Sequence, residues 1–323
     1  MKGRLAMICA SCKHENLKKH GHDRHGNQRY RCTLCGVTWI PVRPKLFGDM
    51  RIDEKDGILC LRMLLEGNSI RTTERLTGIN RNTILRLLET IGNRALRYWD
   101  DKMTNLSAQN VECDEIWGFV GCKQKTNNRI HKGYEFGDAY CFTAIERDTK
   151  LMVAWHLGKR SPQDAKCFAD RLRYVTSGRF QVSTDGYGPY TEAVPNAFDD
   201  QVDFAQLIKI YHQPAGPESR YSPAEIAEIH TKMVCGNPAP DLICTSHVER
   251  QNLNIRMGIR RMTRLTNAFS KKWENHEAHL AIYFLYYNFC RVHATLKTTP
   301  AVKAGLTDRV WSIEKLLNEL AGL

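Results

Sequence analysis

Four cysteines near the N-terminus constrain this chain more than any other feature. Cys9 and Cys12 (CASC) and Cys32 and Cys35 (CTLC) form two pairs, each with two intervening residues, and nineteen residues separate the pairs. This spacing is typical of a tetrahedral zinc site, because each pair can lie on one tight turn with both thiolates directed at one ion. A stretch of about 35 residues buries too little apolar surface to fold without such a link. We therefore predict structural Zn²⁺ in a zinc ribbon over residues 1–46.

The ligand set leaves one choice open, and the other cysteines need a separate explanation. A nearby histidine could replace one of the four thiolates. The chain holds 12 cysteines, and the other eight are scattered mostly through apolar segments. We expect these eight to be small buried hydrophobes in a reducing compartment, not disulfides or nucleophiles.

The charge balance indicates a polyanionic partner. The 323 residues carry 47 Lys and Arg against 35 Asp and Glu, a formal net charge of +12. Residues 1–50 hold 10 basic and 3 acidic side chains, whereas residues 111–200 hold 12 and 13. Such a surplus attracts nucleic acid at long range. A membrane is a weaker candidate because no segment approaches about 20 apolar residues. We expect a soluble intracellular protein without a signal peptide.

A helical segment follows the cysteine region. Over residues 69–92 (SIRTTERLTGINRNTILRLLETIG), Ser69 can cap a short helix and Gly78 lies in the turn that follows. Asn80 can then cap a second helix, which gives the layout of a helix-turn-helix that reads the DNA major groove. The alternative is an ordinary helical hairpin. Within a predicted DNA-binding region at 47–104, the candidate contacts are Asn80, Arg81, Asn82 and Arg86.

From about residue 107 the pattern becomes that of a mixed α/β domain. The predicted order is β-β-β-α-β-α-β. Asp114 lies within the first strand and Asp185 at the carboxyl end of the fourth. If these strands are neighbours, both carboxylates lie at one edge of the sheet. Glu115 competes with Asp114, and because successive side chains on a strand face opposite sides, we expect only one of the two to reach the site.

A third acid, Glu249, lies in the run SHVERQNLNIRMGIRRMTRL at 246–265. At helical spacing it shares a face with Asn252. Three acids at one point would repel unless a divalent cation neutralised them, and hard oxygen ligands select Mg²⁺ or Mn²⁺. The arginines expected to hold a DNA backbone above such metals are Arg256, Arg260, Arg261 and Arg264.

Several motifs together carry a family resemblance. CDEIWGFVG, STDGYGPY and SHVERQN, followed by RLTNAFSKKWENH, YYNFCRVHATL and TPAVKAGL, resemble the bacterial insertion-sequence transposases of the DDE class, specifically the insertion-sequence-one family. The resemblance covers nearly the whole chain. It implies a ribonuclease-H-like catalytic core behind the zinc ribbon and the helix-turn-helix, with a metal-binding triad at Asp114, Asp185 and Glu249.

The resemblance also sets the expected boundaries of the remaining chain. Sixty-three residues separate Asp185 from Glu249, so we expect an insertion at about 213–245 between the last strand and the Glu249 helix. The catalytic domain is then expected at 105–300 and a helical tail at 301–323.

The activity implied by this resemblance is DNA transposition. A DDE transposase cleaves the ends of an insertion element and joins the 3′-hydroxyl ends to target DNA with Mg²⁺ or Mn²⁺. The implied partner is double-stranded DNA, both element ends and target, bound by a homo-oligomer in the bacterial cytoplasm at the nucleoid. Two alternatives stay open: an inactive or domesticated sequence-specific DNA-binding protein, and another metal-dependent nuclease of the same fold.

Overall fold

The computed structural model describes residues 8–9, 11–24, 26, 28–40, 46–199, 201–212 and 225–322. The chain divides into two compact units, Met1–Lys45 and Leu46–Leu323. Part of the predicted insertion, residues 213–224, lies outside the described residues. Among those that are described, no helix is both long and apolar enough to cross a lipid bilayer.

The first unit contains a small antiparallel sheet next to the cysteines. β1 (Leu17–His22) pairs with β2 (Gln28–Cys32), and β2 pairs with β3 (Thr38–Trp39). Most side chains of β1 and β2 are exposed, whereas Cys9 and Cys32 are buried. Since this sheet buries so little apolar surface, we expect the unit to depend on a link between its cysteines.

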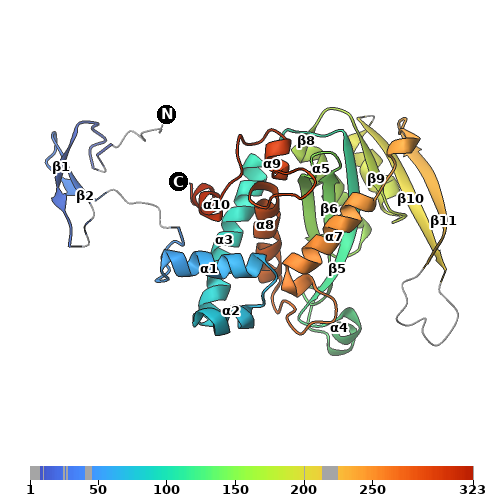
Figure 1. Ribbon diagram of the computed structural model, residues 1–323, viewed down its shortest axis with the longest axis horizontal. Helices are drawn as coiled ribbons and strands as arrows, with labels where there is room; N and C mark the ends of the chain where they lie inside the picture. The colour runs from blue at the N-terminus through green and yellow to red at the C-terminus, as the bar shows by residue number, and fades with distance from the viewer. Residues whose placement is uncertain are drawn as a thin grey trace. The chain divides into compact units, whose positions relative to one another are not determined.

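The second unit is built on a mixed sheet in the order β11-β10-β9-β5-β6-β7 (Figure 1). The last three strands in this order form an antiparallel meander that reaches one edge of the sheet. Two strands run parallel to the first strand of the meander, and an antiparallel strand closes the opposite edge. The strands are β5 (Asn110–Val120), β6 (Gly137–Glu146), β7 (Met152–Gly158), β9 (Phe180–Thr184), β10 (Val202–His212) and β11 (Glu225–Cys235). The predicted mixed α/β architecture is confirmed.

Helices flank this sheet and extend beyond it. They are α1 (Glu54–Leu65), α2 (Ile70–Thr77), α3 (Arg81–Lys102), α4 (Gln124–Ile130), α5 (Pro162–Val175), α6 (Tyr190–Phe198), α7 (Ser246–Gly258), α8 (Trp273–Phe289), α9 (Pro300–Lys303) and α10 (Ile313–Leu320). A minor parallel pair joins β4 (Leu106–Ser107) to β8 (Thr176–Ser177). Two short 3-10 turns, η2 (Pro240–Leu242) and η3 (Arg260–Met262), lie on either side of α7 in the chain.

The helices cover both faces of the sheet. On β6, the Phe142 ring packs against Phe168 of α5 and Tyr190 of α6, with centroids 5.6 and 6.4 Å away. The next residue, Thr143, points to the opposite face, where its hydroxyl lies 3.3 Å from the Oδ1 of Asn252 in α7. Because side chains alternate along a strand, α5 and α6 cover one face while α7 covers the other.

The described part of the predicted insertion differs from expectation. Residues 225–235 form β11, which extends the sheet by pairing with β10. Most of the β11 side chains whose exposure is described are exposed. Burial on one face is what produces an alternating apolar pattern. The strand therefore lacks the sequence signal that marks the other strands.

The helical segment at 47–104 shares its core with the sheet. Ser69 caps α2, Gly78 ends it in the left-handed conformation (φ 71°), and Asn80 caps α3, at the positions that the sequence indicates. α3 then continues for 22 residues and packs along α8. The segment is thus joined to the core through one long helix.

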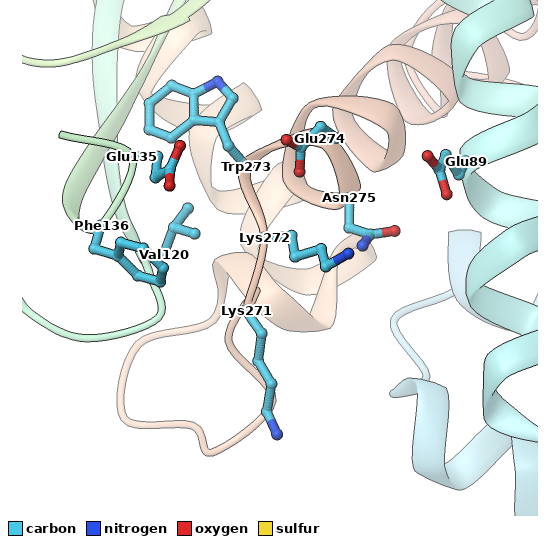
Figure 2. A pocket seen from close by; sticks show the side chains of 9 residues that line it. All are labelled: Glu89, Val120, Glu135, Phe136, Lys271, Lys272, Trp273, Glu274 and Asn275. Atoms are coloured by element: carbon cyan, nitrogen blue, oxygen red, sulfur yellow. The ribbon is translucent and has the colours of Figure 1, made fainter. Parts of the chain in front are cut away.

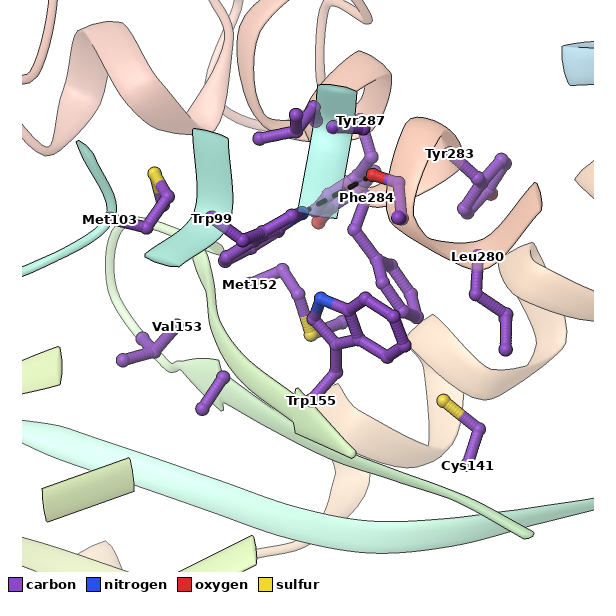
Figure 3. Packing of buried hydrophobic residues seen from close by; sticks show 14 of the residues in the cluster. Trp99, Met103, Cys141, Met152, Val153, Trp155, Leu280, Tyr283, Phe284 and Tyr287 are labelled. Carbon is purple, nitrogen blue, oxygen red and sulfur yellow. Dashed lines mark hydrogen bonds between the residues drawn. The ribbon is translucent and has the colours of Figure 1, made fainter. Parts of the chain in front are cut away.

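Aromatic side chains make this junction between helices and sheet (Figure 3). The Trp99 indole of α3 donates its Nε1–H to the Ala281 carbonyl of α8 at 3.2 Å. Its ring lies 6.4 Å from that of Trp155 on β7, which in turn lies 5.4 Å from Phe284 of α8. All three aromatic side chains are buried.

The C-terminal tail also packs on this core. α10 buries Ile313, Leu316 and Leu317. Just before it, the Trp311 ring stacks on Phe289 at the end of α8, with centroids 4.3 Å apart. The apolar face of this last helix is therefore buried against the rest of the chain.

The close approach of α3 and α8 leads to a testable prediction. A Cβ added at Gly92 would lie 2.3 Å from the Cβ of Ala278, so Gly92→Ala must push the helices apart. Alanine favours a helix over glycine by about 1 kcal/mol. We nevertheless expect overpacking to lower the free energy of unfolding by about 1–3 kcal/mol in urea denaturation. Asn93→Ala, on the exposed side of α3, is the control. Undiminished stability of Gly92→Ala would contradict this packing.

Candidate functional site

Two parallel strands bring the first two predicted acids together. β5 and β9 pair in register from Asn110 opposite Gln181 to Cys113 opposite Thr184, where the pairing ends. Asp114 is the next residue of β5 and Asp185 follows the last residue of β9, so the two lie side by side at the carboxyl end of this parallel pairing. The neighbour relation on which the prediction depended is present. Such strand ends are where open α/β sheets commonly bind ligands.

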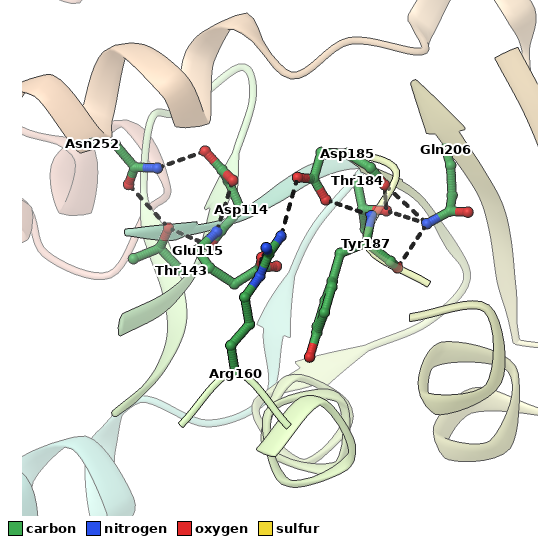
Figure 4. Close-up of polar contacts among 9 residues, drawn as sticks. All are labelled: Asp114, Glu115, Thr143, Arg160, Thr184, Asp185, Tyr187, Gln206 and Asn252. Atoms are coloured by element: carbon green, nitrogen blue, oxygen red, sulfur yellow. Dashed lines mark hydrogen bonds and ion pairs between the residues drawn. The ribbon is translucent and has the colours of Figure 1, made fainter. Parts of the chain in front are cut away.

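Three carboxylates converge at this point, from Asp114, Glu115 and Asp185 (Figure 4). Each offers one oxygen within 4.8 Å of the others. The expectation that only one of Asp114 and Glu115 could reach the site is therefore wrong. The two do leave opposite faces of β5, since Asp114 accepts from Asn252 of α7 at 2.7 Å and Glu115 from Arg160 before α5 at 3.1 Å. Both reach the same place because Asp185 lies past the last paired residue of β9, at the edge between the two faces.

Glu249 lies in the first turn of α7, in the same groove as Asp114. Its carboxylate accepts from the Thr245 hydroxyl at 2.7 Å and forms an ion pair with Lys209 of β10. The groove has a volume of about 750 Å³ and is lined by Asp114, Glu115 and Glu249 among others. The Glu249 side chain is 45% exposed, so it is open to solvent. Glu115, and not Glu249, belongs to the close cluster.

The environment of the cluster disfavours ionised carboxylates. Burial, together with the negative charges of Asp185 and Glu249, raises the pKa of Asp114 to about 7. Burial likewise raises the pKa of Glu115 to about 7, with Asp185 as the next contribution. Desolvation and like charges both favour the protonated form. A bound cation would reverse this preference.

The residues of the cluster fit a divalent cation. The Glu115 side chain is only 2% exposed, and its Oε1 has no hydrogen-bond partner among the described residues. Its Oε2 accepts from Arg160, whose guanidinium lies 4.0 Å from Asp185 and 4.4 Å from the centroid of the Tyr187 ring. One arginine thus contacts two of the three carboxylates, those of Glu115 and Asp185. Oxygen ligands of this kind suit Mg²⁺ or Mn²⁺.

Hydrogen bonds hold the cluster in place. The Asp185 Oδ1 accepts from the Tyr187 N–H at 2.9 Å, and the Gln206 amide of β10 donates to the Asp185 carbonyl at 2.9 Å. The Thr143 hydroxyl donates to the Asp114 carbonyl at 3.2 Å. Arg160, Gln206 and Thr143 carry no sequence motif, and only the tertiary structure reveals them as neighbours of the site.

The arginines that follow Glu249 do not all face the groove. α7 ends at Gly258, so the helical spacing does not continue through the arginines beyond it. Arg261 is buried and donates from Nη1 to the Ser270 hydroxyl at 3.1 Å and to the Asn275 carbonyl at 2.6 Å. This corrects the expectation that Arg261 contacts DNA, since its charge is committed inside the protein. The arginines that line the groove are Arg256, Arg260 and Arg264.

In the first unit, the four cysteine sulfurs form one cluster. All four lie within 4.8 Å of one another, with Cys9 and Cys35 at 3.6 Å and Cys12 and Cys32 at 3.6 Å. Tetrahedral zinc with Zn–S bonds of about 2.3 Å separates its sulfurs by about 3.8 Å. The pKa of Cys9 is lowered to about 6, chiefly because the backbone N–H of Cys12 stabilises the Cys9 thiolate. The cluster could hold Zn²⁺ without a histidine.

The candidate contacts on the helix pair occupy the start of α3. Arg81, Asn82 and Arg86 are exposed. The Asn80 side chain accepts from the Asn82 N–H at 2.9 Å as a helix cap, so its carbonyl oxygen has a structural partner. Three of the four side chains are thus free of such a capping role.

A second pocket does not include the cluster of Asp114, Glu115 and Asp185 (Figure 2). Its volume is about 420 Å³, and its lining mixes acidic, basic and aromatic side chains, including Glu135, Lys272 and Trp273. Lys159 approaches the Trp273 ring to 5.0 Å from the centroid. Its lining includes none of the predicted acids.

Comparisons with known proteins give little further information. No family model matches the sequence. Among solved structures, the chain is similar to the piggyBac transposase synaptic complex with hairpin DNA, determined by cryo-EM, at 10% sequence identity and a TM-score of 0.38. The similarity covers 84% of this chain and 71% of that chain.

Zinc content tests the cysteine cluster. We expect one Zn²⁺ per chain after dialysis, measured by elemental analysis, and loss of that ion in Cys12→Ser because a tetrahedral thiolate site needs all four ligands. Cys167 lies outside the cluster and is exposed, which contradicts the expectation that all eight remaining cysteines are buried. Cys167→Ser should keep the ion. Full zinc retention by Cys12→Ser would show that the cluster is not the ligand set.

The raised pKa of Asp114 predicts a pH-dependent change in stability. Between about pH 4 and 7 the unfolded chain loses this proton while the folded chain keeps it, so stability falls as pH rises through that window. In urea at pH 8 with a chelator, we expect Asp114→Asn to be more stable than the unmodified protein by roughly 1–3 kcal/mol. Near pH 4 the gain should disappear. An equal difference at both pH values would contradict the buried-charge explanation.

Proposed function

We propose that this protein is a DNA transposase of the DDE class that cleaves insertion-element ends and joins their 3′-hydroxyls to target DNA. The observation that carries the proposal is the convergence of Asp114, Glu115 and Asp185 at one strand end. Asp114 and Glu115 line a groove that is also lined by Glu249 and arginines. Acids that bind metal beside cations that bind phosphate are what phosphoryl transfer on DNA requires.

The topology supports a ribonuclease-H-like core. An antiparallel meander is followed by two strands parallel to its first member. Asp114 lies on that first strand, Asp185 follows the fourth strand of the core, and Glu249 comes from a helix across one face. The motifs quoted above resemble the insertion-sequence-one family, and we retain that family as part of the proposal.

Each acidic residue then has a role toward the metal. Asp114 and Asp185 would hold divalent cations, Mg²⁺ or Mn²⁺, with Glu249 as the third predicted ligand and Glu115 as a further one. Bound cations would supply activation of the attacking hydroxyl and stabilisation of the leaving 3′-oxygen. Arg256, Arg260 and Arg264 would hold the DNA backbone across the groove.

The N-terminal parts would recognise the element ends. The Cys9, Cys12, Cys32 and Cys35 cluster would carry structural Zn²⁺ in a basic zinc ribbon. Arg81, Asn82 and Arg86 at the start of α3 present donors for phosphates and base edges. Because two ends must meet, the active form would be a homo-oligomer on double-stranded DNA, at the nucleoid of a bacterial cytoplasm.

The alternatives differ in what the site must do. An inactive DNA-binding protein would not need a buried cluster of carboxylates, which is unfavourable without a cation. A nuclease of the same fold would cleave without joining strands. The cluster favours a metal-dependent enzyme, and strand joining separates the transposase from the nuclease.

A cleavage and joining assay tests the proposal. With Mn²⁺ and duplexes bearing the repeats that flank the gene, the unmodified protein should nick at the repeat ends and join the new 3′-hydroxyl to a plasmid. Asp114→Asn and Asp185→Asn should reduce both steps by at least about 10³-fold, because each removes a metal ligand, and should leave end binding intact.

Arg171→Gln is a suitable control, because Arg171 pairs with Asp100 at the surface, and it should remain active. Joining by Asp114→Asn at the normal rate would refute the site. Nicking without any joining would favour the nuclease.

A further inference from the structure

Glu112 is a buried acid that the proposed reaction does not use. It lies on β5 two residues before Asp114, so both side chains face α7. Its side chain is 2% exposed. An acid buried to this degree needs partners that stabilise its charge.

Those partners belong to the first turn of α7. The Glu112 Oε2 accepts from the backbone N–H of His247 at 2.8 Å and of Val248 at 3.1 Å. Its Oε1 lies 2.5 Å from the Nδ1 of His247. A carboxylate at this position satisfies unpaired N–H groups and faces the positive end of the helix dipole.

α7 has no cap from its own sequence. Thr245 stands at the N-cap, but its side chain makes no capping hydrogen bond. Its hydroxyl instead donates to Glu249 at 2.7 Å. Glu112 therefore caps the helix from another element, and frees Thr245 to hold Glu249.

A second set of hydrogen bonds joins the same strand and helix. The Asn252 amide donates to Asp114 at 2.7 Å, and the Thr143 hydroxyl lies 3.3 Å from the Asn252 Oδ1. β5 is thus bound to α7 at His247 and Val248, and again at Asn252. Glu249 lies between these two hydrogen-bonded contacts, so the position of its carboxylate relative to Asp114 depends on both.

We infer that Glu112 is a positioning residue that sets the distance between Glu249 and the carboxylates of Asp114 and Asp185. The inference rests on the proposed function, since it assumes that these acids bind a common metal centre. It extends the site by a residue that contacts neither metal nor DNA.

A metal site at Glu112 itself is the competing explanation. Glu112, Cys244 and His247 offer ligand atoms within 4.8 Å of one another. However, both oxygens of Glu112 already have hydrogen-bond partners in α7, and a helix N-terminus favours an anion over a cation. The Cys244 sulfur has its own partner in the Ser246 hydroxyl at 3.0 Å.

Mn²⁺ binding to the full chain without DNA tests the inference. We expect Glu112→Ala to weaken Mn²⁺ affinity by about 10–100-fold in electron paramagnetic resonance titrations, the usual effect of removing a residue that orients metal ligands. Glu112→Gln should recover most of it, because one amide oxygen can accept both backbone N–H groups. Glu112→Asp, which keeps the charge but shortens the side chain, should be intermediate and is available if the alanine variant does not fold.

Glu146→Ala is the matched control. The Glu146 carboxylate is also buried and accepts from the N–H groups of Asp148 and Thr149, but it holds the β6–β7 turn instead of α7. We expect the Glu146→Ala variant to lose stability in urea and to keep its Mn²⁺ affinity. Equal loss of affinity in both alanine variants, or none in Glu112→Ala, would overturn the inference.

Two further measurements separate the possible failures. A second zinc ion per chain that is lost in Glu112→Ala would make the cluster a metal site and overturn the positioning role. If the unmodified protein binds Mn²⁺ but does not cleave DNA, the proposed function fails while the affinity comparison still decides the role of Glu112. If it binds no Mn²⁺ at all, the inference fails.

Discussion

The parallel pairing of β5 with β9 is the contact on which the site depends. The last residues paired are Cys113 and Thr184. β9 ends there and is followed by Asp185, whereas β5 continues through Asp114. Without this register, Asp114 and Asp185 would be two unrelated acids, 71 positions apart in the sequence. The helices on both faces of the sheet hold that register by burying the side chains of the strands between them.

The site concentrates negative charge where the fold disfavours it. Burial and mutual repulsion raise the pKa values of Asp114 and Glu115 to about 7, while Arg160 balances part of the charge. Unfavourable burial of acidic groups is common at functional sites, since a structure selected for stability alone would place apolar residues there. The arrangement at Glu112 is the opposite, because both oxygens of this buried carboxylate have hydrogen-bond partners in α7. Glu112 lies two residues before Asp114 on β5.

Much of the architecture could be predicted, and the failures have physical causes. Strands buried on one or both faces have apolar patterns that the sequence shows, whereas β11 is largely exposed and shows none. Glu115 could not be placed from alternation alone, because alternation describes the direction of a side chain and not the position of Asp185 beyond the paired part of β9. Arg261 could not be distinguished from Arg260 and Arg264, because the helix ends at Gly258 and the 3-10 turn that follows changes which side chains face inward.

The cysteine pairs, the helix caps at Ser69 and Asn80, and the candidate acids were all evident from the amino-acid sequence. These depend on spacings of a few residues, which local geometry translates directly into structure. The folded chain was needed to show which acids meet, which arginines line the groove, and that Glu112 and Thr143 support the acids. Those relations join residues far apart in the chain, and they follow from strand register and helix packing, for which a single sequence carries no local signal.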